Sequence, residues 1–592
     1  MHSLRIRLSD GLHFYRPSFC RFSLIVLSLL FFGCASSPDH PEPDPDNGGL
    51  VLPEGFSAVV VVDSLQGAAR HLTVRDNGDI FVKLRFVQED GGNAVLRDLN
   101  GDGKADTIQR FGNYENDGNY GTAMKIRGDY LYYSSQSRVF RQKLEGDEMV
   151  PQSEMQLVLD DNFPNRRREH MAKPISFDDK GYMYVPFGAP SNCCQEPKRT
   201  PGQPGLDPCP QLENHAGIWR FEEGEINLTR EDGERYATGI RSIVGMDWNR
   251  QDDKLYAVVH GRDDLLRLFA DRFSPWQSAL LPSEEFIRVS ENDNFGWPYC
   301  YYDQMQGKKV LNPEYGGDGQ KAGRCGTFKK PEMGFPGHWA PNELLFYQGE
   351  QFPDRYRSGA FIAFHGSTNR APYPQSGYFI GYVPFQDGRV TGDWEIFADG
   401  FAGIDTIENT RDAHYRPMGI ATGPDGSLYV SDTEKGKIWR IMYTGDPDDF
   451  SDESLENMEA RKLMAHISTP DQVEDNLQRT VALPGAKIYN TYCGTCHQRN
   501  GKGDGGRFPS LVNEEWVGGD KDRLISLVIN GMEGEIVVNG RTYNNIMPQH
   551  SFLKDDEIAR VLTYVRQNFG NNYEAVETED VAKIRIKQGD RQ

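Results

Sequence analysis

The sequence predicts a large all-β domain followed by a small all-α domain. From about Gly49 to Tyr443, strand signals dominate and little helical periodicity is present. One phrase recurs there: a turn built on Asp, Asn or Gly, followed by alternating apolar and aromatic residues. Repeated hairpins of this kind over about 400 residues are typical of the blades of a β-propeller. Near the end of the chain, Asp555 to Asn568 has the pattern of a capped amphipathic helix, with residues 558, 561, 562 and 565 on one face.

The recurring phrase predicts where individual hairpins lie. It is found at residues 74–82, 177–185, 248–258 and 423–430. Further strand pairs fit residues 129–144, 217–226 and 359–365. The spacing is irregular, so the number of blades cannot be obtained from the period alone.

Composition limits the classes of partner. The chain has 592 residues, of which 65 are basic and 87 are acidic, and its formal net charge is −22. Binding to nucleic acid requires a basic face, so this balance argues against a nucleic-acid partner. A small neutral substrate or a basic electron acceptor fits the charge better.

The N-terminus is typical of an export signal. Four arginines precede a short apolar run at residues 22–32, which ends in Gly33-Cys34. The pattern resembles a bacterial lipoprotein signal over residues 1–34, with Cys34 as the lipid attachment site and residues 35–49 as a flexible tether. We therefore expect an exported protein, either periplasmic or anchored in the outer membrane. The alternative is an exported protein whose Cys34 is unmodified.

A motif for covalent haem lies near the C-terminus. Cys493 and Cys496 are separated by two residues and followed at once by His497. Two thiols at this spacing can form thioethers with the haem vinyl groups, and the adjacent imidazole becomes an axial ligand. The alternative is a redox-type Cys-x-x-Cys, but that does not account for the histidine. We therefore predict a haem c, which carries single electrons.

The second axial ligand is predicted further along the chain. Met547, followed by Pro548, is the expected ligand because a thioether opposite imidazole raises the haem potential. Met532 and His550 are the competing candidates. With residues 445–480 as an acidic linker, the remaining boundaries are a propeller at 50–444, a cytochrome c domain at 481–572 and a charged C-terminal tail at 573–592.

An oxygen-rich loop in the first part of the propeller could bind calcium. Carboxylates and amides alternate with glycines at Asp98, Asn100, Asp102 and Asp106. This pattern is typical of loops that wrap calcium, although the distal glutamate of an EF-hand is missing. A plain Asp/Gly turn is the alternative.

Five of the nine cysteines lie between Cys34 and the haem motif, in the part of the chain that we expect to fold in an oxidising compartment. We expect a disulfide between Cys300 and Cys325, and another between Cys209 and either Cys193 or Cys194. One thiol, or a vicinal bond, would then be left over.

Several loop segments resemble one family, the soluble aldose dehydrogenases that use pyrroloquinoline quinone (PQQ), including the sorbosone and pyranose dehydrogenases. The resemblance covers about Pro53 to Tyr443 and rests on the order of six segments: 169–170, 239–245, 260–264, 294–300, 364–370 and 415–419. It implies a six-bladed propeller that binds PQQ and calcium.

The resemblance also implies roles for individual residues. His170 matches the general base and Arg241 the arginine over the reactive quinone carbonyl. Arg370 and Arg416 match positions that pair with the tricarboxylate cofactor. The alternatives are a histidine satisfied by a neighbouring carbonyl and arginines that are solvated charges. The backbone carbonyls of Gly261 and Arg262 match those that hold the calcium ion of the cofactor.

Together these observations predict an exported dehydrogenase. A sugar or related alcohol or aldehyde would be oxidised with His170 as base, and electrons would pass from PQQ to the haem and then to a respiratory carrier. Two rival functions stay open: a calcium-dependent hydrolase of the lactonase type, and a carbohydrate-binding propeller that only positions the cytochrome. The arginines at 241, 370 and 416 favour the dehydrogenase, because a tricarboxylate cofactor needs them.

Overall fold

The structure is a computed structural model that describes residues 40–114, 117–162, 169–404, 406–469, 485–498, 500–503, 508–512, 515–544 and 546–589. The predicted signal segment, with its lipid attachment site at Cys34, and residues 470–480 of the predicted linker lie outside this part of the chain. Among the described residues, no helix combines the length and the apolar character needed to span a bilayer.

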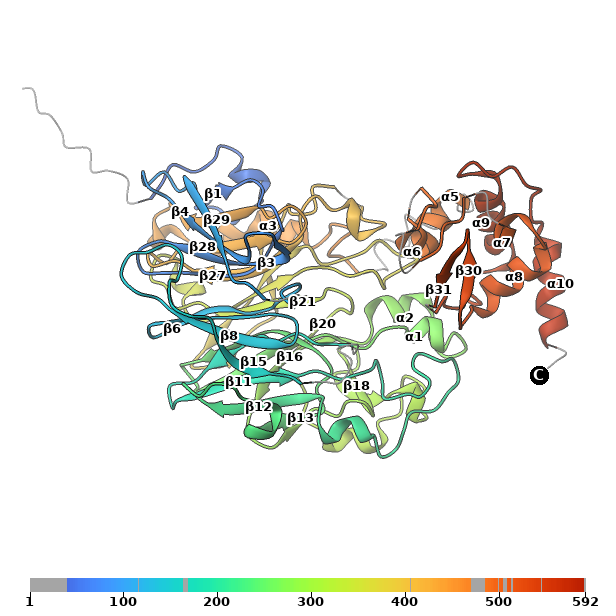
Figure 1. The fold of residues 1–592 in the computed structure, drawn as a ribbon, viewed down its shortest axis with the longest axis horizontal. Coiled ribbons are helices and arrows are strands. Elements are labelled where there is room, and N and C mark those ends of the chain that lie inside the picture. The colour runs from blue at the N-terminus through green and yellow to red at the C-terminus, as the bar shows by residue number, and fades with distance from the viewer. Residues whose placement is uncertain are drawn as a thin grey trace, which may run out of the picture. The chain divides into compact units, whose positions relative to one another are not determined.

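Six sheets of four or five strands form the blades of the predicted propeller (Figure 1). The first blade consists of β2 (Ala69–Val74), β3 (Ile80–Gln88), β4 (Gly91–Arg97) and β5 (Thr107–Phe111). The second consists of β6 (Met124–Arg127), β7 (Tyr130–Ser134), β8 (Arg138–Lys143) and β9 (Gln156–Asp160). The third consists of β10 (Ser176–Phe177), β11 (Tyr182–Phe187), β12 (Gly217–Glu222), β13 (Glu234–Thr238) and the later strand β17 (Asp293–Asn294).

The other three blades follow in chain order. The fourth contains β14 (Ile243–Asn249), β15 (Lys254–Val259), β16 (Glu284–Val289) and β20 (Met333–Phe335). The fifth contains β21 (Pro341–Phe346), β22 (Ala360–Phe364), β23 (Phe379–Val383) and β26 (Glu395–Ala398). The sixth contains β27 (Pro417–Thr422), β28 (Leu428–Asp432), β29 (Ile438–Tyr443) and β1 (Phe56–Val62). Short pairs β18–β19 (Cys300–Asp303, Lys308–Leu311) and β24–β25 (Phe385–Gln386, Arg389–Val390), with helices α1 (Leu265–Leu268) and α2 (Pro275–Leu280), occupy the connections.

The first and last strands of the propeller close the ring. β1 pairs antiparallel with β29, and Phe56 stands opposite Tyr443. The sixth blade is therefore completed by the N-terminal strand, which leaves no gap between the first and last blades. The predicted hairpin phrases also have a common place: in four blades each one spans the turn between the first and second strands.

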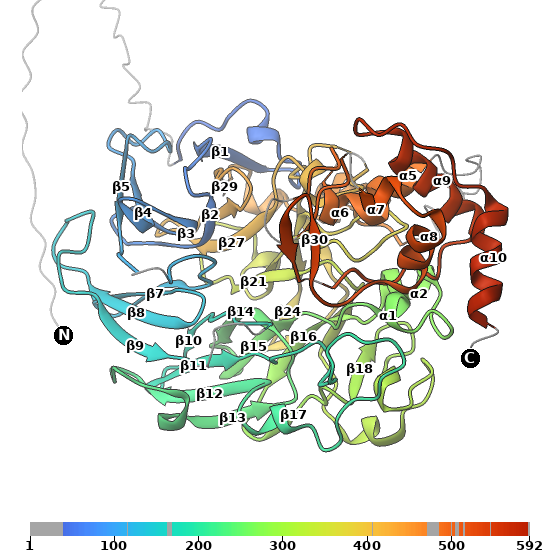
Figure 2. The ribbon, with the colours of Figure 1, turned by 45° about the vertical axis from the view of Figure 1, so that its right-hand side comes forward.

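The first strands of the blades lie around the centre of the propeller. Contacts join β2 to β6 and β27, β10 to β14, and β14 to β21. Figure 2 shows β2, β27, β21 and β14 near one another in the middle of the propeller. Residues from the C-terminal ends of these strands line one central cavity of about 270 Å³. Because the strands share this direction, the loops that precede them lie at the opposite end of the centre. Loops that come from all blades can therefore build one shared site there.

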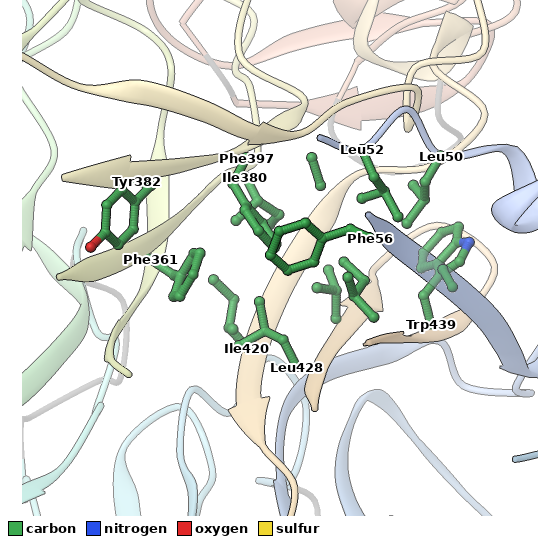
Figure 3. Packing of buried hydrophobic residues seen from close by; sticks show 14 of the residues in the cluster. Leu50, Leu52, Phe56, Phe361, Ile380, Tyr382, Phe397, Ile420, Leu428 and Trp439 are labelled. Atoms are coloured by element: carbon green, nitrogen blue, oxygen red, sulfur yellow. The ribbon is translucent and has the colours of Figure 1, made fainter. Parts of the chain in front are cut away.

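Aromatic packing fixes the closure of the ring (Figure 3). The ring of Phe56 makes edge contacts with Phe352 and Phe397, at centroid distances of 4.9 and 5.1 Å. Burying one such side chain contributes roughly 1.5–3 kcal/mol. Residues from the predicted linker join this region, since α3 (Glu456–Arg461) packs against β26 and buries Met458. The linker is therefore part of the propeller surface at least as far as Ser468.

One disulfide lies in the β11–β12 connection of the third blade, and the other lies in the long connection between β16 and β20 of the fourth. They join Cys194 to Cys209 and Cys300 to Cys325, while Cys193 is a buried thiol. The expected pairing is confirmed, and the choice that the sequence left open falls on Cys194.

The C-terminal domain is a small helical bundle. Its elements are α5 (Gly485–Ile488), a π-helical turn (Tyr489–Cys493), α6 (Gly494–His497), α7 (Glu515–Gly518), α8 (Lys521–Asn530), the hairpin β30–β31 (Ile536–Val538, Arg541–Tyr543), α9 (Asp555–Gln567) and α10 (Thr578–Gly589). The predicted apolar face of α9 is buried in its core. The predicted tail contains α10, which packs on α8 and α9 because Val581 and Ile584 also join the core.

Candidate active site and haem-binding site

His170 lies in the loop before β10, with a backbone φ of 56°. Its Nδ1 is 2.8 Å from the carbonyl oxygen of Ala189. A carbonyl can only accept, so Nδ1 carries the proton and Nε2 is left as an acceptor. Burial and the nearby Arg241 hold the pKa of His170 well below its ordinary value, so the ring is neutral. The carbonyl contact foreseen as an alternative is present, and it leaves Nε2 able to act as a base.

Arg241 lies in the loop before β14 and is only 5 % exposed. Its Nη1 donates to the carbonyl of Gly261 at 2.6 Å, and its Nη2 donates to Asn192 Oδ1 at 2.9 Å and Asp263 Oδ2 at 2.8 Å. Its own carbonyl accepts from the amide of Ala189 at 2.8 Å. Ala189 therefore bonds to both His170 and Arg241, and the structure brings the two predicted catalytic residues together.

Asp263 is the centre of this hydrogen-bond network. Besides Arg241, it accepts from Arg199 Nη2 at 3.1 Å and from Asn369 Nδ2 at 3.0 Å. Burial alone would raise the pKa of Asp263, but the two arginines hold it well below its usual range. Asp263 was not among the predicted site residues, although it stands inside segment 260–264. An acidic residue next to a predicted cofactor loop was the available signal.

Gly261 and Arg262 lie next to this network, as the resemblance implies. The amide of Gly261 donates to Glu284 Oε2 at 2.8 Å, while its carbonyl accepts from Arg241. The side chain of Arg262 forms an ion pair with Glu314, and both of these side chains are almost fully buried. Binding of calcium by the two backbone carbonyls stays a prediction.

A second group of arginines surrounds Arg416, which precedes β27. Its Nη2 contacts His365 Nδ1 at 2.9 Å. Arg85 donates to Glu434 Oε1 at 3.2 Å, and Arg70 donates to a backbone carbonyl. Burial, together with repulsion from Arg85 and Arg416, lowers the pKa of Arg70 to about 9. Positive charge is therefore concentrated here beyond what Glu434 neutralises, which suits an anionic ligand.

Arg70 and Arg85 were missed by the sequence reasoning. Arg70 belongs to β2 and Arg85 to β3, far along the chain from Arg416. A lone arginine in a strand gives no signal of this kind, because its partners are set by how the first blade meets the sixth.

Arg370 is directed away from the other predicted cofactor residues. It is 1 % exposed, and its guanidinium donates to the backbone carbonyls of Ser468 and Ala465. The neighbouring Asn369 contacts Asp263 instead. Pairing of Arg370 with a cofactor carboxylate stays a prediction, and it would require the guanidinium to leave these carbonyls.

The oxygen-rich loop in the first blade is an exposed turn. Asp98 accepts from the amides of Gly101 and Gly103, at 2.7 and 2.8 Å, and Asp102 accepts from that of Lys104. Asp106 accepts from the amide of Leu99. In the part of the chain that the structure describes, no three His, Cys, Asp or Glu side chains are grouped as metal ligands. Calcium at this loop stays a prediction.

The haem motif lines apolar cavities in the helical domain. Cys493, Cys496 and His497 reach them from the π-helical turn and α6, and Cys493 and Cys496 form no disulfide. The Nδ1 of His497 lies 2.9 Å from the carbonyl oxygen of Pro509. A ligating histidine usually donates its other N–H in this way, which leaves Nε2 for the iron. These residues fit a covalent haem.

The three candidates for the sixth ligand lie around the same cavities. Met547, Met532 and His550 all line them. The backbones of the two methionines are bonded to one another, by amide–carbonyl contacts of 2.8 and 2.9 Å. The preference for Met547 therefore stays a prediction.

The fold and these sites define a two-domain protein, in which a propeller with a buried histidine–arginine site precedes a haem-binding domain. The chain belongs to the TrAA12-like family, which it matches over residues 50–444. Residues 482–569 match the cytochrome c family, so the predicted cytochrome c domain is confirmed.

Curated relatives cover parts of the chain. An uncharacterized protein of Borreliella burgdorferi is 30% identical over 220 residues, which are 37% of this chain and 51% of the relative. The chain thus spans about half the length of that protein. Cytochrome c-552 of Thermus thermophilus is 37% identical over 113 residues, which are 18% of this chain and 86% of the relative.

Two solved structures share the propeller fold. The calcium structure of the Trichoderma reesei carbohydrate-active enzyme of family AA12 has a TM-score of 0.53 and 17% identity, and covers 67% of this chain and 97% of its own. The holo form of the pyranose dehydrogenase PQQ domain from Coprinopsis cinerea has a TM-score of 0.51 and 18% identity. It covers 68% of this chain and 98% of its own. At these identities the likeness establishes the fold alone.

Proposed function

We propose that the chain is a PQQ-dependent dehydrogenase that oxidises a sugar or a related alcohol or aldehyde and passes the electrons to its own haem c. The observation that carries the proposal is the arrangement of His170, whose Nε2 is left as an acceptor beside the fixed guanidinium of Arg241. The holo pyranose dehydrogenase domain, a propeller of the same fold, supports PQQ as the cofactor.

The residues present fit a tricarboxylate quinone. The concentration of charge at Arg416, Arg70 and Arg85 is what carboxylates would neutralise, and Arg241 would lie at the reactive end. When bound, PQQ supplies an electrophilic carbonyl that accepts hydride and later releases two electrons one at a time.

Calcium is the second proposed cofactor of the propeller. The carbonyls of Gly261 and Arg262 are oxygen donors of the type that calcium prefers, and the buried carboxylate of Glu284 and the partly exposed carboxylate of Asp263 lie nearby. The Trichoderma AA12 enzyme was also solved with calcium, which supports the proposal.

The side chains of the site would share the work of the reaction. His170 Nε2 would take the proton from the substrate hydroxyl as hydride leaves the carbon that carries this hydroxyl. Arg241 presents a fixed positive charge where negative charge develops on oxygen. Asp263 and Asn192 hold that guanidinium in place before substrate arrives, so no reorganisation is needed during the reaction.

The haem would take the electrons in single steps and release them to a respiratory carrier. Fusion of the two domains raises the effective concentration of the haem near the propeller, which gives the second domain a kinetic purpose. We further propose that the protein is exported and anchored to a membrane through lipid on Cys34. Mass spectrometry of the N-terminal peptide tests this proposal, because an unmodified Cys34 contradicts it.

Haem reduction by substrate is the direct test of the proposed function. Purified full-length protein with calcium is mixed with aldoses, alcohols and aldehydes, with and without PQQ, and haem absorbance is followed. We expect reduction only when PQQ and a substrate are both present, and its loss in His170→Ala. His414→Ala, which removes an exposed histidine, is the matched control. If PQQ neither binds nor changes reduction with any substrate, the assignment is wrong and hydrolysis of lactones is tested next.

A further inference from the structure

Glu284 joins two loops at the edge of the site, one that contains Gly261 and one that contains His338 and Ala340. It is the first residue of β16 and is only 4 % exposed. Its Oε2 accepts from the amide of Gly261 at 2.8 Å, and its Oε1 accepts from the amides of His338 and Ala340 at 2.9 and 3.3 Å. A carboxylate that accepts three backbone amides is held firmly and holds those amides in return.

The backbone of Gly261 is held at its amide and at its carbonyl oxygen, which belong to successive peptide units. Glu284 binds its amide, and Arg241 Nη1 donates to its carbonyl at 2.6 Å. A side chain at this position would lie 3.0 Å from the carbonyl oxygens of Pro282 and Ser283, so little space remains for the backbone to move sideways. Glu284 and Arg241 therefore hold Gly261 together, Glu284 at the amide and Arg241 at the carbonyl oxygen.

Two carboxylates, those of Glu284 and Asp263, lie near this carbonyl together with the guanidinium of Arg241. A carbonyl oxygen has two lone pairs, and Arg241 uses one of them. Glu284 and Asp263 are close enough for their carboxylates to repel one another. A divalent ion at the remaining lone pair would relieve that repulsion, and calcium accepts carbonyl and carboxylate oxygens in flexible geometry.

We propose that Glu284 is a positioning residue for the calcium ion of the propeller site, because it holds the loop at the amide of Gly261 and supplies negative charge beside it. This inference rests on the proposed function, which places calcium at the carbonyls of Gly261 and Arg262. Glu284 touches neither substrate nor cofactor in this arrangement and acts through the backbone of its neighbours. Removing such a partner of a metal ligand typically lowers metal affinity by about 10- to 100-fold.

Two substitutions at this position separate its contributions. Glu284→Gln keeps the size of the side chain but removes its charge, and it turns an NH₂ group toward backbone amides that need an acceptor. Glu284→Asp keeps the charge with a shorter reach. Glu285→Gln is the matched control, because Glu285 is adjacent on β16 and pairs with Lys309 at 2.8 Å.

The measurement is calcium binding by isothermal titration calorimetry, on the full-length haem-containing protein. All variants carry Asp98→Asn and Asp102→Asn, so that the exposed loop of the first blade does not contribute. We expect Glu284→Gln to weaken calcium binding by about 10- to 100-fold. Glu284→Asp should weaken it less, and Glu285→Gln should leave it unchanged. Circular dichroism checks that each variant is folded, and Glu284→Asp carries the test if Glu284→Gln is not.

Each outcome separates this proposal from the proposed function. Wild-type affinity in folded Glu284→Gln overturns the positioning role, and so does an equal loss in Glu285→Gln. If the parent binds no calcium but its haem is still reduced by a sugar with PQQ, the positioning role is overturned and the dehydrogenase stands. If calcium binding falls as expected but no substrate reduces the haem, the positioning role stands and the proposed function fails.

Discussion

Asp263 accepts a hydrogen bond from the guanidinium of Arg241 at 2.8 Å, and both side chains are held in place by further polar partners. The pair fixes a positive charge beside His170, where Arg241 is almost fully buried and the side chain of Asp263 is 26 % exposed. Burial of the guanidinium reduces its screening by water, so the charge acts more strongly than it would in bulk solvent.

Removing the charge of Asp263 should impair the reaction more than the fold. Asp263→Asn leaves Arg241 and Arg199 with a weaker acceptor, so we expect kcat/KM for substrate-driven haem reduction to fall by about 10- to 100-fold. Haem content and the circular dichroism spectrum should stay unchanged. The control is Asp271→Asn, at an exposed position whose ion pair lies on the surface. Unchanged kinetics in Asp263→Asn would contradict the role given to the pair.

The pH dependence should report the depressed pKa of His170. Because its folded-state pKa lies well below the ordinary value of 6.5, the base stays neutral at pH 6.5, and the acid limb of kcat/KM should lie below that pH. The stability of the fold should fall with decreasing pH in the same way as the rate does. The unfolded chain binds the proton more readily, so stability falls as pH drops below about 6.5. A pH–rate profile checks this, and an acid limb assigned to His170 at or above pH 6.5 contradicts it.

The arginine cluster around Arg416 should govern quinone affinity. Loss of one charged hydrogen bond costs about 1.5–3 kcal/mol, so Arg70→Met should weaken PQQ binding by roughly 10- to 100-fold. Fluorescence titration of the calcium-loaded protein measures this. Arg75→Met is the control, since Arg75 directly follows the same strand at its far end and bonds to the carbonyl of Gly146. Equal affinities in both variants would show that the cluster does not bind the quinone.

The haem potential should identify the sixth ligand. A thioether opposite His497 raises the potential, so Met547→His should lower it by on the order of 100 mV, within the roughly 0.8 V range that axial ligands cover. Spectroelectrochemical titration of the full-length protein provides the measurement. Met532→His is the matched control and should change the potential little. A larger shift in Met532→His would transfer the assignment to that methionine.

The features that could be predicted from the sequence depend on residues close together in the chain. The thiols and imidazole of the haem motif act within five consecutive residues, at 493–497. Each hairpin turn is specified by its own Asp, Asn and Gly, and α9 by its own periodicity. His170 and Arg241 could be predicted because their segments resemble those of a known family.

By itself, therefore, the sequence determined the haem, the β-rich blades, the order of the domains and two of the catalytic candidates. Only the tertiary structure decided that Asp263 holds Arg241, that Arg70 joins Arg416, and that Glu284 holds the Gly261 amide. It also turned Arg370 toward the segment after the propeller. The physical reason is that these contacts join loops from different blades. Their geometry depends on how the blades close into a ring, which no local pattern encodes.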